Sequence, residues 1–237
     1  MSLKYKYYIT TSDKVMWSLK ECSHSFNHFC DAKIRPTVLG YEKPEFELPE
    51  NFEFLSMGKD RGITYWAEDL YNAFSNIDED FIIWGLDDYE YQKRFELDVI
   101  NDICQNHLNE NTNWFGLSDG PAKRSHELVK DYGDFQVIKL KQDAEYRVTC
   151  QVNIWNRKRL VHYLRVAAMS NQRVLSYPPG SPWYFEVLCS QLAKNDGYDV
   201  YAFKNIVPVH YRGLNYTVQN ESIQPNRIKV PFNKDKK

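Results

Sequence analysis

The segment at residues 81–90, FIIWGLDDYE, constrains this chain most, because six uncharged residues lead directly into two adjacent aspartates. The uncharged run predicts an apolar strand, with Asp87 and Asp88 at its carboxyl end. Two ionised carboxylates this close repel each other, so a cation, a proton or solvent must relieve them. A divalent cation shared with substrate phosphates would do so, whereas the simpler alternatives are a helix cap at Asp88 or two solvated loop residues.

Strands alternate with helices over roughly the first 115 residues. Apolar side chains recur at helical spacing within residues 15–29, 66–77 and 95–104, and short apolar strands lie at 5–10, 34–40, 52–57 and 81–86. This alternation predicts an α/β fold with a mostly parallel sheet flanked by helices.

The second half has a different pattern, which predicts an antiparallel C-terminal part. Residues 146–155 alternate, with Tyr146, Val148, Cys150, Val152 and Ile154 on one side and Thr149, Gln151 and Asn153 on the other. We therefore expect a half-buried strand with one polar face. Helices should follow at 159–168 and after the loop at 170–181. Without an internal repeat or a long linker, the chain is expected to form a single domain, with a frayed tail at residues 216–237.

Composition restricts the classes of partner. The chain carries 30 Lys and Arg against 32 Asp and Glu, so its net charge of -2 predicts neither a nucleic-acid-binding nor a membrane-surface protein. Its longest apolar runs are too short for a transmembrane segment, and no signal-peptide pattern opens the sequence. With five irregularly spaced cysteines, these features predict a cytoplasmic protein.

Four segments, taken in order, carry a resemblance to a known family. They are TTSD at residues 10–13, FIIWGLDDY at 81–89, QVNIW at 151–155 and SPWYFE at 181–186. Together they resemble the GT-A type of nucleotide-sugar glycosyltransferase over about residues 5–213. The resemblance implies one GT-A-like domain, with a nucleotide-sugar half at about 1–120 and an acceptor half at about 121–215.

The same resemblance implies a metal site. Enzymes of this type hold Mn²⁺ or Mg²⁺ against the donor diphosphate with an Asp-x-Asp or equivalent carboxylate motif, for which Asp87-Asp88-Tyr89 stands here. We expect Asp88 to bind the metal and Asp87 to bind a sugar or ribose hydroxyl. His210, near the end of the fold, is the expected further ligand, although a lone histidine at a strand end is more often structural.

The resemblance also implies nucleotide contacts. Thr10, Thr11 and Asp13 lie at the end of the first strand, and Lys59 and Arg61 follow the strand at 52–57. We expect these residues to bind the nucleotide sugar together with Asp87. An ordinary solvated charge cluster is the alternative for residues 59–61.

On the acceptor side, Ser181 and Pro182 suit the N-cap and first position of a helix. Glu186 lies one turn further on, without an ion-pair partner at helical spacing. By resemblance it is the general base, with a pKa raised by shielding from Trp183, and Trp155 and Trp183 flank the acceptor. The alternatives are an exposed helix glutamate and two core tryptophans.

These expectations combine into a metal-dependent, inverting glycosyltransferase. It would move a sugar from a nucleoside-diphosphate sugar to a hydroxyl acceptor, expected to be a glycan. The alternatives are a metal-dependent phosphodiesterase or nucleotidyltransferase, which would need further carboxylates for a second metal, and a non-catalytic carbohydrate-binding protein, which would not need the aspartate pair.

Overall fold

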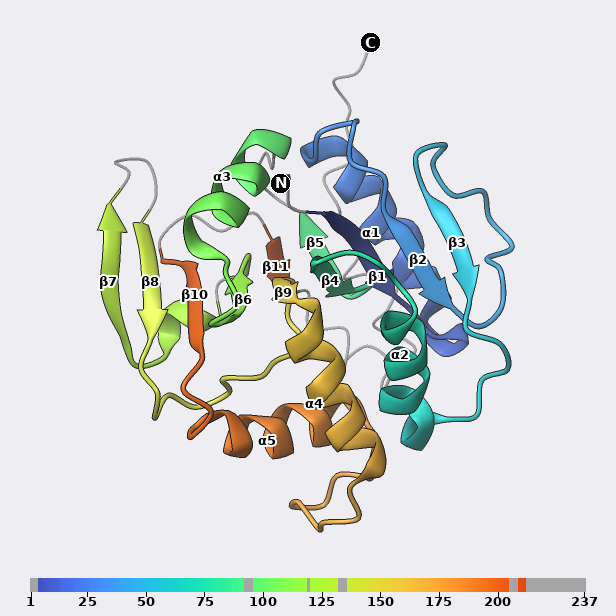
Figure 1. Ribbon diagram of the computed structural model, residues 1–237. Coiled ribbons are helices and arrows are strands. Elements are labelled where there is room, and N and C mark those ends of the chain that lie inside the picture. The colour runs from blue at the N-terminus through green and yellow to red at the C-terminus, as the bar shows by residue number, and fades with distance from the viewer. Residues whose placement is uncertain (1–3, 92–95, 119, 132–135, 205–208, 212–237) are drawn as a thin grey trace.

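The structure is a computed structural model that describes residues 4–91, 96–118, 120–131, 136–204 and 209–211. Nine strands form one mixed sheet in the order β3-β2-β1-β4-β9-β6-β10-β8-β7, and β5 and β11 form a separate two-stranded ribbon (Figure 1). Both halves of the chain contribute strands to the large sheet. The frayed tail predicted at residues 216–237 lies outside the described residues.

In the first half of the chain, the predicted strands and helices begin and end close to the expected bounds. The strands are β1 (Tyr5–Thr10), β2 (Thr37–Gly40), β3 (Glu53–Ser56), β4 (Phe81–Leu86), β5 (Tyr89–Tyr91), β6 (Thr112–Gly116), β7 (His126–Asp131), β8 (Gln136–Leu140), β9 (Asn153–Asn156), β10 (Asp199–Phe203) and β11 (Val209–Tyr211). The helices are α1 (Met16–Phe29), α2 (Trp66–Ser75), α3 (Leu97–His107), α4 (Arg157–Met169) and α5 (Pro182–Ala193), with short 3₁₀ turns η1 (Asp13–Val15), η2 (Ile63–Tyr65) and η3 (Pro121–Lys123).

The direction of the strands changes at β9. Strands β3, β2, β1 and β4 are mutually parallel, as the α/β pattern predicts. Strand β9 lies antiparallel between β4 and β6, in the middle of the sheet, and β8 and β7 extend the far edge in antiparallel fashion beside β10. The sheet is therefore mixed rather than mostly parallel.

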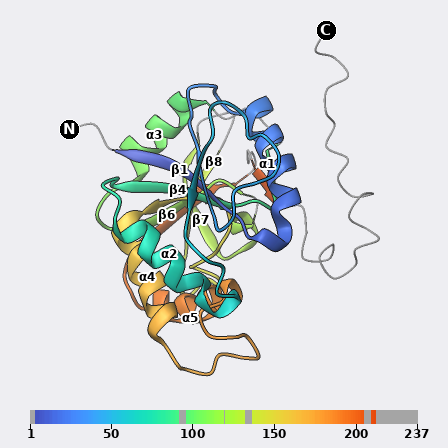
Figure 2. The same ribbon diagram turned by 90° about the vertical axis from the view of Figure 1, so that its right-hand side faces the viewer.

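Helices cover both faces of the sheet, with α1 and α3 on one side and α2, α4 and α5 on the other (Figure 2). Successive residues of β4 enter opposite cores, Ile83 that of α1 and α3, and Ile82 and Trp84 that of α2, α4 and α5. Burial on both faces explains why β4 reads as an unbroken apolar run.

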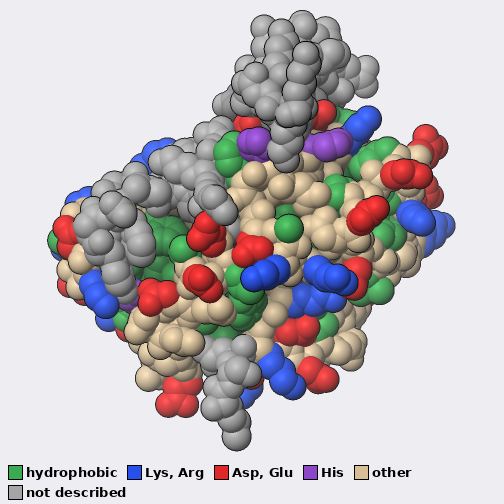
Figure 3. Space-filling view, turned by 90° about the horizontal axis from the view of Figure 1, so that it is seen from above, with side chains coloured by type: hydrophobic (Ala, Val, Ile, Leu, Met, Phe, Trp, Pro, Cys, Tyr) green, Lys and Arg blue, Asp and Glu red, His purple; other side chains and the backbone are tan. Residues whose placement is uncertain are grey.

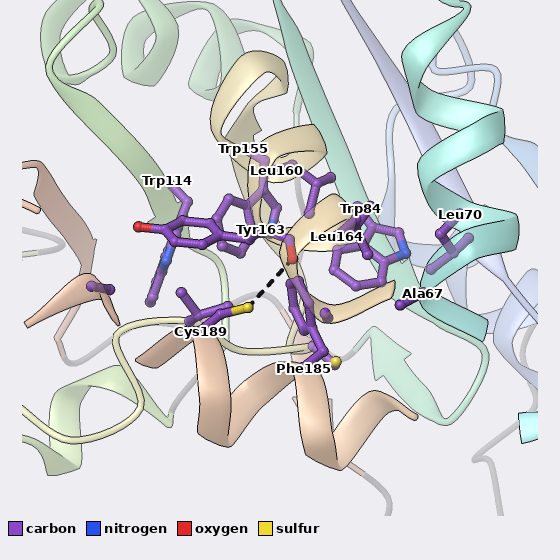
Figure 4. Close-up of a cluster of buried hydrophobic side chains, with 14 of the residues drawn as sticks. Ala67, Leu70, Trp84, Trp114, Trp155, Leu160, Tyr163, Leu164, Phe185 and Cys189 are labelled. Atoms are coloured by element: carbon purple, nitrogen blue, oxygen red, sulfur yellow. Dashed lines mark hydrogen bonds between the residues drawn. The ribbon is translucent and has the colours of Figure 1, made fainter. Parts of the chain in front are cut away.

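Trp155 belongs to the core rather than to an acceptor site. It is fully buried in the cluster of Figure 4, with its ring centroid 5.8 Å from that of Trp114 and 6.3 Å from that of Tyr163. A ring without exposed surface cannot touch an acceptor. The expectation that Trp155 binds the acceptor is therefore wrong, and the alternative of core packing holds.

Residues 146–152 are not a strand, although Asn153–Asn156 are. Tyr146 has a positive φ of 50°, which interrupts extended backbone. Thr149 and Asn153, expected on a polar face, are as buried as Val148 and Val152, and Arg147 is fully buried as well. The alternation in sequence therefore marks a buried, irregular segment whose backbone polar groups bond to side chains instead of to a neighbouring strand.

Helix α5 begins as the sequence predicts. The Ser181 hydroxyl accepts a hydrogen bond from the Tyr184 backbone N–H at 3.3 Å, and Pro182 occupies the first turn. This start fixes the position of Glu186 in the second turn.

Within the described residues, none of the helices has the length and apolar character needed to cross a bilayer. The top of the molecule as drawn in Figure 1, around α1 and α3, carries acidic and basic side chains scattered among other polar surface (Figure 3).

Candidate functional site

Asp87 is held rigidly at the carboxyl end of β4. Its backbone N–H donates to the Thr10 carbonyl at 3.1 Å, which continues the pairing of β4 with β1. The Thr11 hydroxyl donates to Asp87 Oδ2 at 2.6 Å, and both residues are buried. Thr11 therefore orients the first carboxylate of the pair, and the structure brings these two predicted site residues together.

Asp88 is partly exposed and directly precedes β5. Strand β11 pairs with β5 so that the backbone of His210 lies opposite Glu90, two residues beyond Asp88. The chain thus returns to the aspartate segment at the histidine that the sequence singles out. Nothing is described for the His210 side chain, so its role as a metal ligand stays a prediction.

Glu186 reaches from α5 to the irregular segment before β9. Its Oε1 accepts hydrogen bonds from the Cys150 backbone N–H at 2.7 Å and from the Thr149 hydroxyl at 2.8 Å. Within the described part of the chain, Oε2 has no hydrogen bond. Burial raises the pKa of Glu186, and the two hydrogen bonds and the positive charge of Arg124 only partly oppose it.

Glu186 and Asp88 both act electrostatically on Cys150, although 98 positions separate the two carboxylates in the sequence. Burial raises the pKa of the Cys150 thiol well above its ordinary value, and the negative charges of Glu186 and Asp88 raise it further. Both carboxylates are therefore within electrostatic range of one thiol, and Glu186 also contacts the backbone of the same residue. This shared influence on Cys150 is the central feature of the candidate site.

Arg124 is a site residue that the sequence reasoning missed. It follows η3, donates a hydrogen bond to the Tyr146 carbonyl and lies 5.6 Å from the centroid of the Tyr146 ring. Burial lowers its pKa, while the nearby Glu186 and Tyr89 side chains oppose that shift. Arg124 thus supplies a positive charge within electrostatic range of Glu186 and Tyr89. No pattern around residues 123–124 distinguishes it from a surface arginine.

A second missed feature lies at the end of β6. The Ser118 hydroxyl donates to Gln151 Oε1 at 2.8 Å, and the Gln151 amide lies directly over Gly120, where a Cβ atom would overlap it. Ser118 and Gln151 thus place polar side chains beside the end of β6 and the start of β9, at the same edge of the sheet as Asp87.

Thr10 does not belong to the open site. Its hydroxyl accepts a hydrogen bond from Trp84 Nε1 at 3.2 Å and donates to the Gly85 carbonyl at 3.4 Å, and the residue is buried. The hydroxyl is thus used within the sheet. The expectation of a direct nucleotide contact from Thr10 is wrong, because the strand turns this side chain inward.

The other predicted nucleotide contacts lie along the ends of β1, β2 and β3. Asp13 Oδ1 accepts a hydrogen bond from the Glu42 backbone N–H at 3.1 Å. Arg61 bonds to Asp69 and Glu68 in the first turn of α2, and these hydrogen bonds raise its pKa. Lys59 is exposed. Arg61 therefore pairs with the first turn of α2, which is what the alternative of an ordinary charge cluster predicts for it.

A cavity of about 190 Å³ opens beside this cluster. It lies between the end of β3 and α2 and is lined by Leu55, Ser56, Met57, Asp69, Asn72 and Ala73. The cavity is at the same edge of the sheet as Asp87, but Asp87, Asp88 and Glu186 are not among the residues that line it.

Trp183 is exposed near Glu186, three residues earlier on α5. Its ring stacks on that of Tyr177, with centroids 6.3 Å apart and planes inclined by 22°. An exposed, paired aromatic surface of this kind can pack against the C–H face of a sugar. The structure therefore places Trp183 where an acceptor contact is possible, in contrast to Trp155.

The residues present fit a hard divalent cation of the kind that nucleotide enzymes use. Magnesium is commonly held by one or two carboxylates, waters and substrate phosphates rather than by a complete protein cage. Asp88, with Asp87 beside it, supplies such a donor set. Among the described residues, no group of three or more His, Cys, Asp and Glu side chains is placed to hold a metal ion.

Comparisons with known proteins leave the chain unassigned: no family model matches it, and neither does any curated protein.

Proposed function

We propose that this protein is a metal-dependent glycosyltransferase with a GT-A-like fold, which transfers a sugar from a nucleoside-diphosphate sugar to a hydroxyl acceptor. The proposal is supported by the aspartate pair at the end of β4, where Thr11 orients Asp87, and by Glu186, which contacts the Cys150 backbone while its charge and that of Asp88 both act on the Cys150 thiol. A carboxylate for the metal and a carboxylate suited to proton transfer then lie at one edge of the sheet, where ligands of open α/β sheets bind.

Each carboxylate has a distinct task. Asp88 would hold Mn²⁺ or Mg²⁺, and the bound metal would supply positive charge to neutralise the leaving diphosphate. Asp87, fixed by the Thr11 hydroxyl, accepts a hydrogen bond from a ribose or sugar hydroxyl. Glu186 Oε2 takes the acceptor's proton, because Oε1 is already occupied by Thr149 and Cys150. The raised pKa of Glu186 makes it a better base than an exposed glutamate.

The transfer is a single displacement. The acceptor oxygen forms a bond to the anomeric carbon as its proton moves to Glu186, and the bond from that carbon to the diphosphate oxygen breaks. The nucleoside diphosphate leaves with the bonding electron pair. With Asp88 assigned to the metal and Asp87 to a hydroxyl, Glu186 is the carboxylate that this proposal gives to the acceptor, and a single base favours inversion. Arg124 adds a positive charge beside this centre.

The first experiment tests donor binding. Calorimetry of nucleoside diphosphates with and without Mn²⁺ should give tighter binding with the metal, and Asp88→Asn should remove most of that dependence. The matched control is Asp80→Asn, an exposed aspartate at the opposite end of the same strand, which should behave as wild type. Equal affinity in EDTA for wild type and Asp88→Asn would refute the metal role.

The second experiment tests the base. With a panel of nucleotide sugars and simple glycoside acceptors, Glu186→Gln should retain donor affinity and lose on the order of 10²-fold or more in transfer rate. The exposed Glu110→Gln is the control. A Glu186→Gln protein that binds donor and transfers at the wild-type rate would remove Glu186 from the mechanism.

A further inference from the structure

Exposed apolar side chains gather around the loop between α4 and α5. Of the eleven large hydrophobic residues with high exposure among the described residues, six lie here, each at least 36% exposed. They are Ile63, Tyr65, Met169, Leu175, Tyr177 and Trp183. Met169 and Leu175 reach 69% and 68%, the highest values in the set. Such a concentration is unusual for a surface without a binding role.

The loop and η2 form one continuous surface. The Ala67 backbone N–H donates to the Gly180 carbonyl at 2.9 Å, which ties the loop to the start of α2. Gly180 has a φ of +76°, and a Cβ there would overlap the Thr64 carbonyl, so the loop backbone packs directly on η2. In Figure 1 the loop extends beyond α4 and α5, at the bottom of the molecule. We call residues 63–65 and 169–183 the apolar edge.

Positive charge accompanies the apolar edge. Residues 157–195 contain six Lys and Arg and a single acidic residue, Glu186; four of the six stand at the start of α4 or just after α5, and Arg165 and Arg173 are the two nearest the loop. Near the loop, Arg165 and Arg173 are exposed, and neither forms an ion pair or hydrogen bond with the residues that the structure describes. The net charge of the chain therefore conceals a local excess of positive charge.

A hollow beside α4 is lined by both apolar and positively charged side chains. It has a volume of about 420 Å³ and is lined by His162, Arg165, Val166, Met169 and Ser170. A guanidinium beside exposed aliphatic surface suits a phosphate attached to an acyl chain. Burial, together with Arg159 and Arg165, lowers the pKa of His162, so the arginine supplies the charge at neutral pH.

We propose that the apolar edge docks this protein peripherally on an anionic phospholipid bilayer. Met169, Leu175 and Trp183 enter the interface between headgroups and acyl chains, and Arg165 and Arg173 pair with lipid phosphates. A nucleic acid would use the positive charge but not the aliphatic side chains, so the observations favour the bilayer. Because α5 begins in the apolar edge and carries Glu186 one turn later, docking brings the candidate site to the membrane surface.

The test measures co-sedimentation of the full chain with vesicles of phosphatidylcholine, alone or mixed with phosphatidylglycerol. Wild type should bind the anionic vesicles and lose binding as salt rises. Arg165→Gln with Arg173→Gln should reduce the partition coefficient about fivefold per arginine. Leu175→Glu should reduce it about tenfold or more. Leu128→Glu, which changes another exposed leucine (52% against 68% for Leu175) on the distant strand β7, is the matched control and should bind as wild type.

Three outcomes would overturn the proposal. One is no binding of wild type to anionic vesicles at low salt. Another is equal binding to neutral and anionic vesicles, and the third is an equal loss in Leu128→Glu and Leu175→Glu. Binding of a single-stranded oligonucleotide that is lost in the double arginine variant but kept in Leu175→Glu would instead assign the surface to nucleic acid. Melting temperatures establish that each variant is folded. Vesicle binding does not depend on Asp88 or Glu186, so the docking proposal and the proposed transferase activity are tested separately.

Discussion

Substitution of Arg147 is the strongest test of which interactions hold residues 146–152, the irregular segment before β9, in place. Arg147 is fully buried, and its guanidinium donates to four backbone carbonyls. They belong to Leu140 at 3.2 Å, Lys141 at 2.8 Å, Ala193 at 3.1 Å, and Tyr198. The side chain thus joins the end of β8, the end of α5 and the start of β10. We expect Arg147→Met to destabilise the protein substantially.

The expected loss in the free energy of unfolding follows from the backbone carbonyls that lose the Arg147 guanidinium. All four carbonyls lose the guanidinium, but the Ala193 carbonyl keeps a hydrogen bond from Gln142 Nε2 at 2.8 Å and the Lys141 carbonyl keeps one from the Ala144 N–H at 3.0 Å, so the loss is greatest at Leu140 and Tyr198. Each hydrogen bond to a charged group contributes about 1.5–3 kcal/mol. Removing a buried cation recovers several kcal/mol of desolvation free energy. The net loss should be about 3 kcal/mol, and a chain of this size should then melt about 6–12 °C lower.

Urea unfolding and calorimetry measure the change. Arg147→Lys keeps the charge but not the planar fork, so it should be nearly as destabilised. Arg165→Met, at an exposed arginine without an ion pair in the described structure, should stay within about 0.5 kcal/mol of wild type. If Arg147→Met unfolds with the wild-type free energy, the four hydrogen bonds do not stabilise the segment and the reasoning fails.

Three further predictions concern stability and reactivity. Burial raises the pKa of Glu186, so its ionisation destabilises the fold as pH rises through the raised pKa. Glu186→Gln should therefore be more stable than wild type at pH 7. The difference in melting temperature should vanish toward pH 4, where Glu186 is protonated in both the folded and the unfolded state. An equal difference at both pH values would contradict this. Gly180→Ala should lose about 2 kcal/mol or more, whereas Gly197→Ala, with a similar φ of +74° but open space around it, should lose about 1 kcal/mol in urea unfolding. Cys150 is buried with a raised pKa, so a thiol reagent should label it only after denaturation; rapid labelling in native buffer would count against the packed position of this segment.

Local patterns determined the elements whose residues interact mainly with their sequence neighbours. The apolar run of β4, the helical spacing of α1 and α2, and the Ser181–Pro182 start of α5 are confirmed. Each depends on periodicity or capping within a few residues, which a single sequence displays directly. The aspartate pair at a strand end was readable for the same reason.

Long-range contacts decided the rest. Residues 146–152 alternate like a strand, but Arg147 and Glu186 bind groups far away in the sequence and hold the segment in another conformation. Trp155 and Trp183 look alike in sequence, yet one faces the core and the other solvent. Nothing local places Arg124 beside Glu186, or the loop at 170–181 on η2. Side-chain identity gives the chemistry available, whereas the packing of distant segments determines which groups meet, how deeply they are buried and hence how they ionise.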